Sequence, residues 1–246
     1  MLHKNHHKKT TTTQQMSSSS SSTLLQNCKL TYFGIPGRGE ATRLALTIGG
    51  VTFQDERVAF PDWGKLKPTT PWGSLPILSL EDGRSVAQQR AILRLVGKET
   101  GLYPQDDAFV AAKIDELMDA VEDIGQKTNS VGQGLEKEAK EKARAEACAE
   151  GGVTYAILQN VDNFIAANNG GKGGGYTVGS TLSIADLYLY TSCNNLVSGL
   201  YDGVPTTTTL EPFANINAVR KTVRNHPAVT QYYIDHPTTI ESYGPL

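Results

Sequence analysis

The hydrophobic pattern of the sequence changes near Pro104, and this change limits the folds that are open to the chain. From residue 29 up to that point, short runs typical of strands alternate with runs typical of helices. Beyond it, apolar residues such as Val110, Ile114 and Leu117 recur every three or four positions, which is the spacing of one helix face. We therefore expect an α/β domain over residues 29–104 and an all-helical domain over residues 105–246.

The first of these domains follows one order of elements. The runs "KLTYF" and "VTFQDERV" are predicted strands on either side of a predicted helix, "GEATRLALTIGG", which ends at Gly49 and Gly50. The run "LPILSLEDGRSV" is a predicted hairpin that turns at Asp82 and Gly83, and "QQRAILRLVGKETGLYP" is a helix that ends near Gly101. A βαβ unit followed by a hairpin and a helix predicts a small thioredoxin-like domain.

Residues 1–28 form a low-complexity tail, which we expect to be disordered because it has almost nothing to bury. His3, His6 and His7 lie in this tail, but three solvated histidines make a poor metal site, and no metal is expected. The tail is basic and rich in hydroxyl side chains, as transit peptides are, yet it lacks arginine and an apolar segment. A targeting role for the tail therefore stays open.

Composition and charge narrow the compartment and the partners. Three cysteines, far apart and odd in number, favour a reducing compartment and predict a cytoplasmic protein. The chain has no run of 18 apolar residues and no basic stripe with interleaved aromatics, so neither membrane nor nucleic acid is an expected partner. Residues 29–104 hold 10 basic and 7 acidic side chains, a net charge of +3, whereas residues 105–246 hold 10 and 18, a net charge of −8. This asymmetry indicates either two ordinary surfaces or an anionic ligand on the first domain.

The tip of the first predicted strand carries Tyr32, at a place where α/β folds often position catalytic groups. The glycine-rich turn "GIPGRG" follows it, and no C-x-x-C motif follows the strand, which excludes disulfide exchange there. A phenol with a pKa of about 10 donates a hydrogen bond at neutral pH and lowers the pKa of a thiol beside it. The alternative is a core tyrosine whose hydroxyl is satisfied within the protein.

Pro76 directly precedes the apolar run of the predicted hairpin. Because proline has no N–H group, it is tolerated only at the mouth or edge of a sheet, so a purely structural role is one interpretation. In a thioredoxin-like fold the proline at this place is characteristically cis. The backbone N–H and C=O of Leu75 would then be free to pair with a short peptide.

Four motifs, in order and at matching spacing, resemble those of the cytosolic glutathione transferases, nearest the sigma class and its mu-like relatives. They are "KLTYFGIPGRGEATRLAL", "PDWGKLKPTTPWGSLPIL", "QQRAILRLV" and "TVGSTLSIADLYLY", and the similarity runs from about residue 29 to residue 237. The resemblance implies a homodimeric detoxification enzyme that conjugates the thiolate of glutathione, its co-substrate, to small hydrophobic electrophiles. Two alternatives stay open: a glutathione-dependent isomerase similar to prostaglandin D synthase, and a catalytically weak binding or structural relative.

The resemblance also assigns residues to the glutathione site. It implies that Tyr32 activates the glutathione sulfur and that Arg38 lies near the substrate or the glycyl end of glutathione. The other implied binding residues are Trp63 and Lys67 for the glycine carboxylate, Leu75 and Pro76 for the cysteinyl unit, and Gln88 and Gln89 for the γ-glutamyl group. Two positions depart from the family pattern. Gln89 replaces a serine, and Ser74 stands where sigma-class members often carry lysine or glutamine.

Three features of the second half complete these expectations. One member of the acidic pair Glu122 and Asp123 reaches the glutathione of the neighbouring subunit in sigma-like dimers, and the alternative is a solvated surface pair. The run "SIAD" predicts a structural capping box, with Ser183 as the N-cap and Asp186 at the third helical position. Tyr188, which follows it, either lines the electrophile pocket or belongs to the core.

Overall fold

The computed structural model describes residues 23–169, 175–237 and 243, and its first domain is built on a mixed sheet of strand order β2-β1-β3-β4. The strands are β1 (Lys29–Phe33), β2 (Gln54–Val58), β3 (Ile77–Ser79) and β4 (Ser85–Ala87). β1 runs parallel to β2 and antiparallel to β3, and β3 runs antiparallel to β4. This topology confirms the predicted βαβ unit followed by a hairpin, and with it the thioredoxin-like arrangement.

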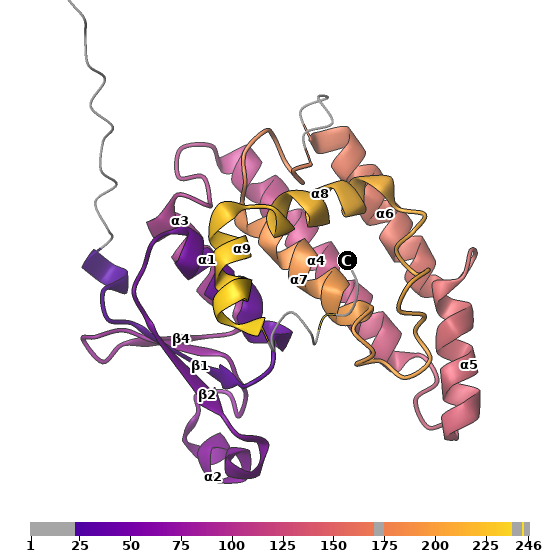
Figure 1. The fold of residues 1–246 in the computed structure, drawn as a ribbon, viewed down its shortest axis with the longest axis horizontal. Coiled ribbons are helices and arrows are strands. Elements are labelled where there is room, and N and C mark those ends of the chain that lie inside the picture. The colour runs from indigo at the N-terminus through magenta and orange to yellow at the C-terminus, as the bar shows by residue number, and fades with distance from the viewer. Residues whose placement is uncertain (1–22, 170–174, 238–242, 244–246) are drawn as a thin grey trace, which may run out of the picture.

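Three α-helices accompany the sheet. They are α1 (Glu40–Ile48), α2 (Trp63–Leu66) and α3 (Gln89–Thr100). α1 and α3 pack against each other on one side of the sheet, whereas the short α2 lies on the other side, away from the helical domain (Figure 1). The hairpin turns at Gly83, which has φ +85°, and α3 ends at the left-handed Gly101, as the sequence predicts.

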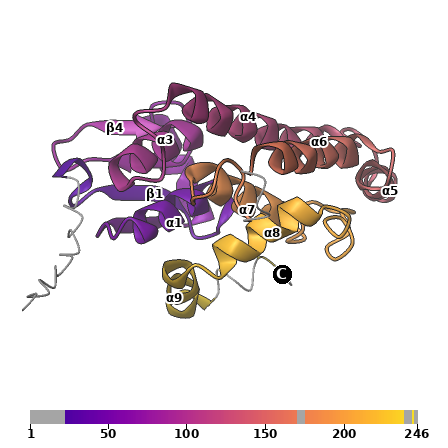
Figure 2. The same ribbon diagram turned by 90° about the horizontal axis from the view of Figure 1, so that it is seen from above.

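The second domain is helical, as predicted. The described residues form α4 (Ala108–Ser130), α5 (Lys137–Cys148), α6 (Val153–Asn168), α7 (Ile184–Leu196), α8 (Ala214–Arg224) and α9 (Pro227–Asp235). α4 and α6 run side by side, and α9 returns to pack on α1 of the first domain (Figures 1 and 2). α7 packs against α4, α8 and α1, so it forms the centre of the molecule.

The predicted capping box starts this central helix. The Asp186 carboxylate accepts hydrogen bonds from the backbone N–H of Ser183 at 2.6 Å, from its hydroxyl at 2.9 Å, and from the N–H of Thr177 at 2.6 Å. Burial raises the pKa of Asp186 to about 6, against the effect of these donors. The box therefore satisfies buried backbone donors at the point where α7 enters the core.

The first described residues lie within the predicted tail, residues 1–28, and they are folded. Thr23–Leu25 forms a short 3-10 turn, and Leu25 and Cys28 are fully buried in the hydrophobic core. A tail that extends to residue 28 is therefore wrong at its C-terminal end, because these side chains find apolar partners. Residues 1–22, with the three histidines, lie outside the described residues. No helix within the described ranges is long and apolar enough to cross a membrane.

Candidate active site

Tyr32 lies near the end of β1, and its side chain is buried, with 6% of the residue exposed. Its hydroxyl oxygen accepts a hydrogen bond from the backbone N–H of Arg38 at 2.9 Å. No acceptor for the hydroxyl proton is found among the described residues. Burial raises the pKa of the phenol above its ordinary value, against the Arg38 N–H and the charges of Arg38 and Arg43, so the group stays protonated at neutral pH. Tyr32 is therefore a neutral donor with its proton unused.

The glycines of the turn allow this approach of tyrosine and backbone. A Cβ atom on Gly37, which has φ +41°, would lie 2.6 Å from the Tyr32 hydroxyl, and one on Gly39 would lie 2.7 Å from the ring. Side chains at either position would displace Tyr32 or the turn. The "GIPGRG" motif is thus explained by close packing of the turn (Gly37–Gly39 is a 3-10 helix) over the tyrosine.

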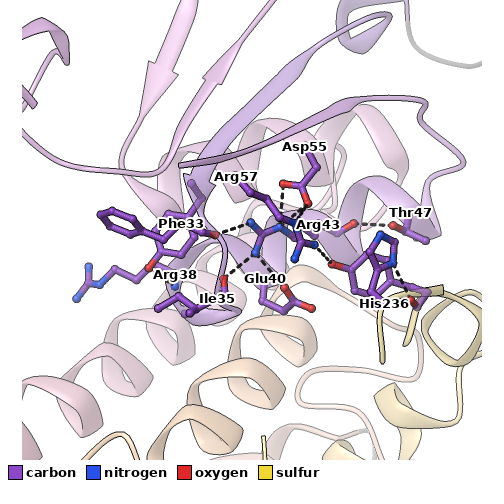
Figure 3. A network of polar contacts seen from close by, with 12 residues as sticks. Phe33, Ile35, Arg38, Glu40, Arg43, Thr47, Asp55, Arg57 and His236 are labelled. Atoms are coloured by element: carbon purple, nitrogen blue, oxygen red, sulfur yellow. Dashed lines mark hydrogen bonds and ion pairs between the residues drawn. The ribbon is translucent and has the colours of Figure 1, made fainter. Parts of the chain in front are cut away.

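Behind the turn, Arg43 of α1 holds the backbone that follows β1 (Figure 3). Its guanidinium donates to the carbonyl oxygens of Phe33 at 3.1 Å and Ile35 at 3.0 Å, and it pairs with Asp55 of β2 at 3.0 Å. It also donates to the buried Glu40 carboxylate at 3.2 Å, whose pKa burial raises despite the nearby Arg43 charge. The Arg43 side chain is fully buried, so this network ties the turn after β1 to α1 and β2.

Arg38 itself points away from that network, toward the helical domain (Figure 3). Its guanidinium pairs with the Glu122 carboxylate of α4 at 2.7 Å, and the other oxygen of Glu122 accepts a hydrogen bond from the Tyr188 hydroxyl of α7. Burial acts to raise the pKa of Glu122, but Tyr188 and then Arg38 outweigh it and hold the pKa below its ordinary value. Three elements, one from the first domain and two from the second, therefore meet at one carboxylate.

A cleft of about 210 Å³ lies at this meeting point, between the turn of the first domain and helices α4 and α7. Arg38, Glu122 and Tyr188 line it, but only 1% of Tyr188 is exposed and the residue belongs to the hydrophobic core, so both alternatives for Tyr188 stay open. Asn195 of α7 donates to the carbonyl oxygen of Gly37 at 3.3 Å and joins the cleft wall to the turn. The cleft is thus an interdomain feature.

Most of the implied glutathione-binding residues lie in the first domain but do not line this cleft; Arg38 and Gln89 do. The Leu75–Pro76 peptide is cis, as predicted, and neither backbone polar group of Leu75 has a partner among the described residues. Trp63 packs edge-on against the Phe33 ring at 5.6 Å, and Lys67 lies exposed in the 3-10 turn that follows α2. None of these residues lines the cleft.

Gln88, Gln89 and Ser74 complete the implied set. Gln88 is exposed and has φ +75°, a left-handed conformation that is uncommon for glutamine and typical of functional sites. Gln89 is the first residue of α3, is buried, and reaches the edge of the cleft. Ser74 is half-buried directly before Leu75. The structure therefore brings Gln89 and Arg38 to the cleft and leaves the other implied residues beside it.

The acidic pair of α4 divides between two faces of the helix. Glu122 points into the cleft of its own chain, as described above, whereas Asp123 is exposed and borders a second hollow between α4 and α6. Of the two residues, Asp123 is thus the one that does not line the interdomain cleft. Glu122 and Asp123 face different ways because adjacent side chains on a helix point about 100° apart.

Sequence reasoning missed the polar residues on the far wall of the cleft. Gln126 and Asn129 of α4, Ser192 and Asn195 of α7, and Tyr201 line it. The four helical residues stand four or seven positions after Glu122 or Tyr188, which is the signal that places them on the same helix faces, whereas Tyr201 follows α7 and gives no such signal. Among the described residues, no group of three or more His, Cys, Asp or Glu side chains is arranged to hold a metal ion.

Comparison with known proteins agrees with this geometry. The family model described as "Glutathione S-transferase, C-terminal domain" matches residues 110–236. Glutathione S-transferase 1 of Ascaris suum is 32% identical over 214 residues, which cover 86% of this chain and 97% of that protein. The hematopoietic prostaglandin D synthase of Gallus gallus is 28% identical over 221 residues, which cover 87% of this chain and 99% of that protein.

Among solved structures, a glutathione S-transferase of Necator americanus that is described as monomeric, Na-GST-3, has 27% sequence identity and a TM-score of 0.68. The match covers 85% of this chain and 97% of that one. The matched family model spans more than half of the chain, and the Ascaris suum relative matches it over most of its length. The chain therefore belongs to the glutathione S-transferase family of enzymes.

Proposed function

We propose that the protein conjugates glutathione to small electrophiles and that the Tyr32 hydroxyl stabilises the glutathione thiolate. The observation that carries the proposal is the hydrogen bonding of Tyr32: its oxygen accepts from the Arg38 N–H and its proton has no acceptor among the described residues. The accepted bond polarises the phenol toward donation. A thiolate placed against the hydroxyl would receive a charge-assisted hydrogen bond, which favours the ionised sulfur.

The chemistry needs little more than this donor and the positioning of two substrates. The thiol of glutathione loses its proton to solvent, and the thiolate remains bound to the Tyr32 hydroxyl. Its electron pair then forms a bond to an electrophilic carbon of the second substrate, which lies in the adjoining cleft. Either a leaving group departs with its electrons or the adduct takes up a proton from water. Holding both reactants in contact supplies much of the acceleration.

Glutathione lies, in this proposal, along the edge formed by the residues before β3 and the start of α3. The free N–H and C=O of Leu75 pair with the cysteinyl unit in the manner of an added strand. Gln88 and Gln89 bind the γ-glutamyl group, with Ser74 beside it. Trp63 and Lys67 bind the glycine carboxylate, and the positive net charge of residues 29–104 favours that anion.

We also propose a homodimer, with Asp123 directed at the glutathione of the partner subunit. Asp123 borders a hollow lined by the apolar Leu117, Ala120 and Phe164, and an apolar area with a polar edge suits an interface. The first domain also exposes Trp72, with 70% of the residue accessible. Since the similar Necator americanus structure is described as monomeric, sedimentation at micromolar concentration is the deciding measurement. A fully active monomer of 26.5 kDa would overturn the dimer.

The function is tested by conjugation of 1-chloro-2,4-dinitrobenzene together with the ultraviolet absorbance of the thiolate in the binary complex with glutathione. We expect activity and a bound thiol whose pKa lies below the value of about 8.5 for a free thiol. A protein that binds glutathione but shows neither would be the catalytically weak relative. Prostaglandin H2 as the substrate tests the isomerase alternative. We favour the transferase because the relative that is 32% identical carries that name, whereas the prostaglandin D synthase is 28% identical.

A further inference from the structure

Helix α5 packs against a turn that carries Tyr201, one of the residues that line the interdomain cleft. The turn runs over residues 201–204, shortly after α7, and the Val204 N–H donates to the carbonyl oxygen of Tyr201 at 3.0 Å. Gly203 has φ +84°, a conformation that glycine adopts readily at the third position of a turn. α5 itself lies at the end of the helical domain that is far from the sheet (Figure 1). It therefore reaches the cleft through this turn.

The backbone of the turn touches the backbone of α5. A Cβ atom on Gly203 would lie 2.4 Å from both the Cα atom and the carbonyl oxygen of Glu141, so no side chain fits between the two segments. Beside this contact, the Lys140 ammonium pairs with the Asp202 carboxylate at 3.4 Å. That pair is partly exposed, with 55% of the Asp202 side chain accessible, so solvent weakens it. The packing at Gly203 therefore fixes the place of the turn more than the ion pair does.

Arg144 contacts the turn from one helical turn further along α5, and it is buried, with 6% of the residue exposed. Its Nη1 donates to the carbonyl oxygen of Asp202 at 3.3 Å, and its guanidinium lies over the Tyr201 ring, 5.9 Å from the ring centre. Among the described residues it forms no ion pair with a carboxylate, and its Nε has no hydrogen-bond partner. The contacts of this buried cation are thus made with the turn, where a ring face and a carbonyl oxygen are its partners.

The Tyr201 side chain extends from the turn to α4. A Cβ atom on Gly125 of α4 would lie 3.4 Å from the Tyr201 hydroxyl, so the hydroxyl lies against the helix at this glycine. The ring is partly buried and packs against the hydrophobic core. Because one end of the side chain touches α4 and its ring faces the Arg144 guanidinium of α5, the place of Tyr201 in the cleft depends on α5.

We infer that Arg144 is a positioning residue for the second substrate: it holds the turn of residues 201–204 and so sets where Tyr201 stands in the cleft. The inference rests on the proposed transferase function, in which the electrophile lies in this cleft. Arg144 and Tyr201 are not among the residues proposed to bind glutathione. Loss of Arg144 should therefore weaken the use of the electrophile and leave the binding of glutathione unchanged.

Arg144→Met removes the charge and the donor and keeps an unbranched side chain, and its kinetics with glutathione and 1-chloro-2,4-dinitrobenzene give the first readout. We expect KM for the electrophile to rise about threefold to tenfold, because a binding contact is lost, and KM for glutathione to stay the same. A variant that is only less stable would lose active molecules, which lowers kcat and moves neither KM. Arg144→Lys keeps a cation and a donor, so it should restore most of the lost kcat/KM.

Tyr201→Ala gives the second readout, because Arg144 is inferred to act through that residue. Arg144→Met should lower kcat/KM for the electrophile about threefold to tenfold in the unmodified protein, and by less than about 1.5-fold when Tyr201→Ala is already present. Gly203→Ala disturbs the same turn without changing the arginine, since its Cβ atom would meet the backbone of α5. It should also raise KM for the electrophile and leave KM for glutathione unchanged.

Arg224→Met is the matched control. Arg224 of α8 also lies over a tyrosine ring, that of Tyr233, at 5.2 Å from the ring centre, but neither residue lines the cleft. Both KM values of this variant should equal those of the unmodified protein. A rise in KM for the electrophile as large as that of Arg144→Met would overturn the inference, because the effect would then not depend on the turn beside the cleft.

The other outcomes separate this inference from the proposed function. If the unmodified protein does not conjugate 1-chloro-2,4-dinitrobenzene, the transferase proposal fails and the inference fails with it. If it does, but Arg144→Met leaves both KM values unchanged or raises both alike, the inference alone is overturned. An equal fall in kcat/KM with and without Tyr201→Ala would also overturn it, because Arg144 would then act without Tyr201. Should Arg144→Met not fold, unchanged KM values in Gly203→Ala would overturn the inference in its place.

Discussion

Two buried tyrosines lie near the cleft, and they have opposite hydrogen bonding. The first belongs to the region behind the first-domain turn, which holds Tyr32, Glu40 and Arg43 and which we call the floor. The second belongs to the group of Arg38, Glu122 and Tyr188 that lines the cleft and that we call the wall. Tyr32, on the floor, accepts a hydrogen bond from the Arg38 N–H, and its proton has no acceptor among the described residues. Tyr188, on the wall, donates its proton to Glu122, and burial together with that carboxylate raises its pKa far above the ordinary value. Residue type and burial are therefore the same in the two tyrosines, and the direction of the hydrogen bond distinguishes them.

The two regions also differ in how firmly their polar groups are held. On the floor, the Arg43 and Glu40 side chains are fully buried. On the wall, 58% of the Arg38 side chain is exposed, so solvent screens its pair with Glu122. The same kind of interaction, arginine with carboxylate, should accordingly contribute very differently to stability in the two places.

Removing the buried arginine of the floor should have the largest effect. Arg43→Met leaves Glu40 as an unpaired buried carboxylate and frees the carbonyl groups of Phe33 and Ile35, so the free energy of unfolding should fall by about 3–5 kcal/mol. Urea denaturation measures this loss. Adding Glu40→Gln to Arg43→Met should restore part of the stability. If the double variant recovers no stability, the loss comes from the missing backbone contacts and not from the unpaired Glu40 carboxylate.

Tyr32→Phe comes next and tests the floor directly. It removes the donor and keeps the ring, and a hydrogen bond to an ionised partner contributes about 1.5–3 kcal/mol. The pKa of the bound thiol should rise by about one to two units, since one unit corresponds to 1.36 kcal/mol. Conjugation near neutral pH should fall tenfold or more, because less of the thiol is ionised there. Above the raised pKa, the rates of the two proteins should converge.

The pH–rate profile of both proteins with one electrophile measures this change. Glutathione affinity should change little, since the remaining contacts are preserved. Superimposed profiles would make Tyr32 a core residue and leave the activation of the thiol to another donor, of which Arg38 is the nearest on the turn.

Glu122→Gln tests the wall and should have a smaller effect. The Arg38 pair is lost, but the amide oxygen still accepts from Tyr188, so stability should fall by no more than about 1 kcal/mol. Urea denaturation at low salt and at about 1 M salt separates the contributions, because screening weakens an exposed pair at high salt. A loss of several kcal/mol that salt does not change would place Glu122 with the buried network of the floor.

The sequence predicts some features of these two regions and misses others, and the difference has a physical reason. Tyr32, the "GIPGRG" turn, Pro76 and the capping box depend on local backbone constraints, and those appear in short stretches of sequence. The partners of Arg43 and Glu122 lie 12 and 84 residues away, at Asp55 and Arg38, so only the packing of elements brings them together. The second strand shows this clearly. Val51, Phe53 and Val58 predict it, but β2 begins at Gln54, and its charged residues Asp55 and Arg57 pair within the Arg43 network.

The wall of the cleft was the least predictable part for the same reason. Gln126, Asn129, Ser192 and Asn195 are residues that usually cover solvated helix faces, and their spacing alone shows no shared cleft. The boundary at residue 28 failed because two apolar residues, Leu25 and Cys28, follow a run of polar ones and are buried by distant partners.

The smallest expected effect is that of Tyr188→Phe, and it completes the comparison because the chemical change is the same as in Tyr32→Phe. The Tyr188 proton already belongs to a hydrogen bond with Glu122, so it is not available to a thiolate. Glu122 keeps its pair with Arg38 and its contact with Gln126. The pKa of the bound thiol should therefore not move, and the conjugation rate near neutral pH should change by less than about twofold, with any loss confined to stability. The pH–rate profile, measured beside that of Tyr32→Phe, checks this. A shift of equal size in the two variants would mean that the proton of Tyr188 reaches the sulfur, and that the direction of the hydrogen bond does not distinguish the two tyrosines.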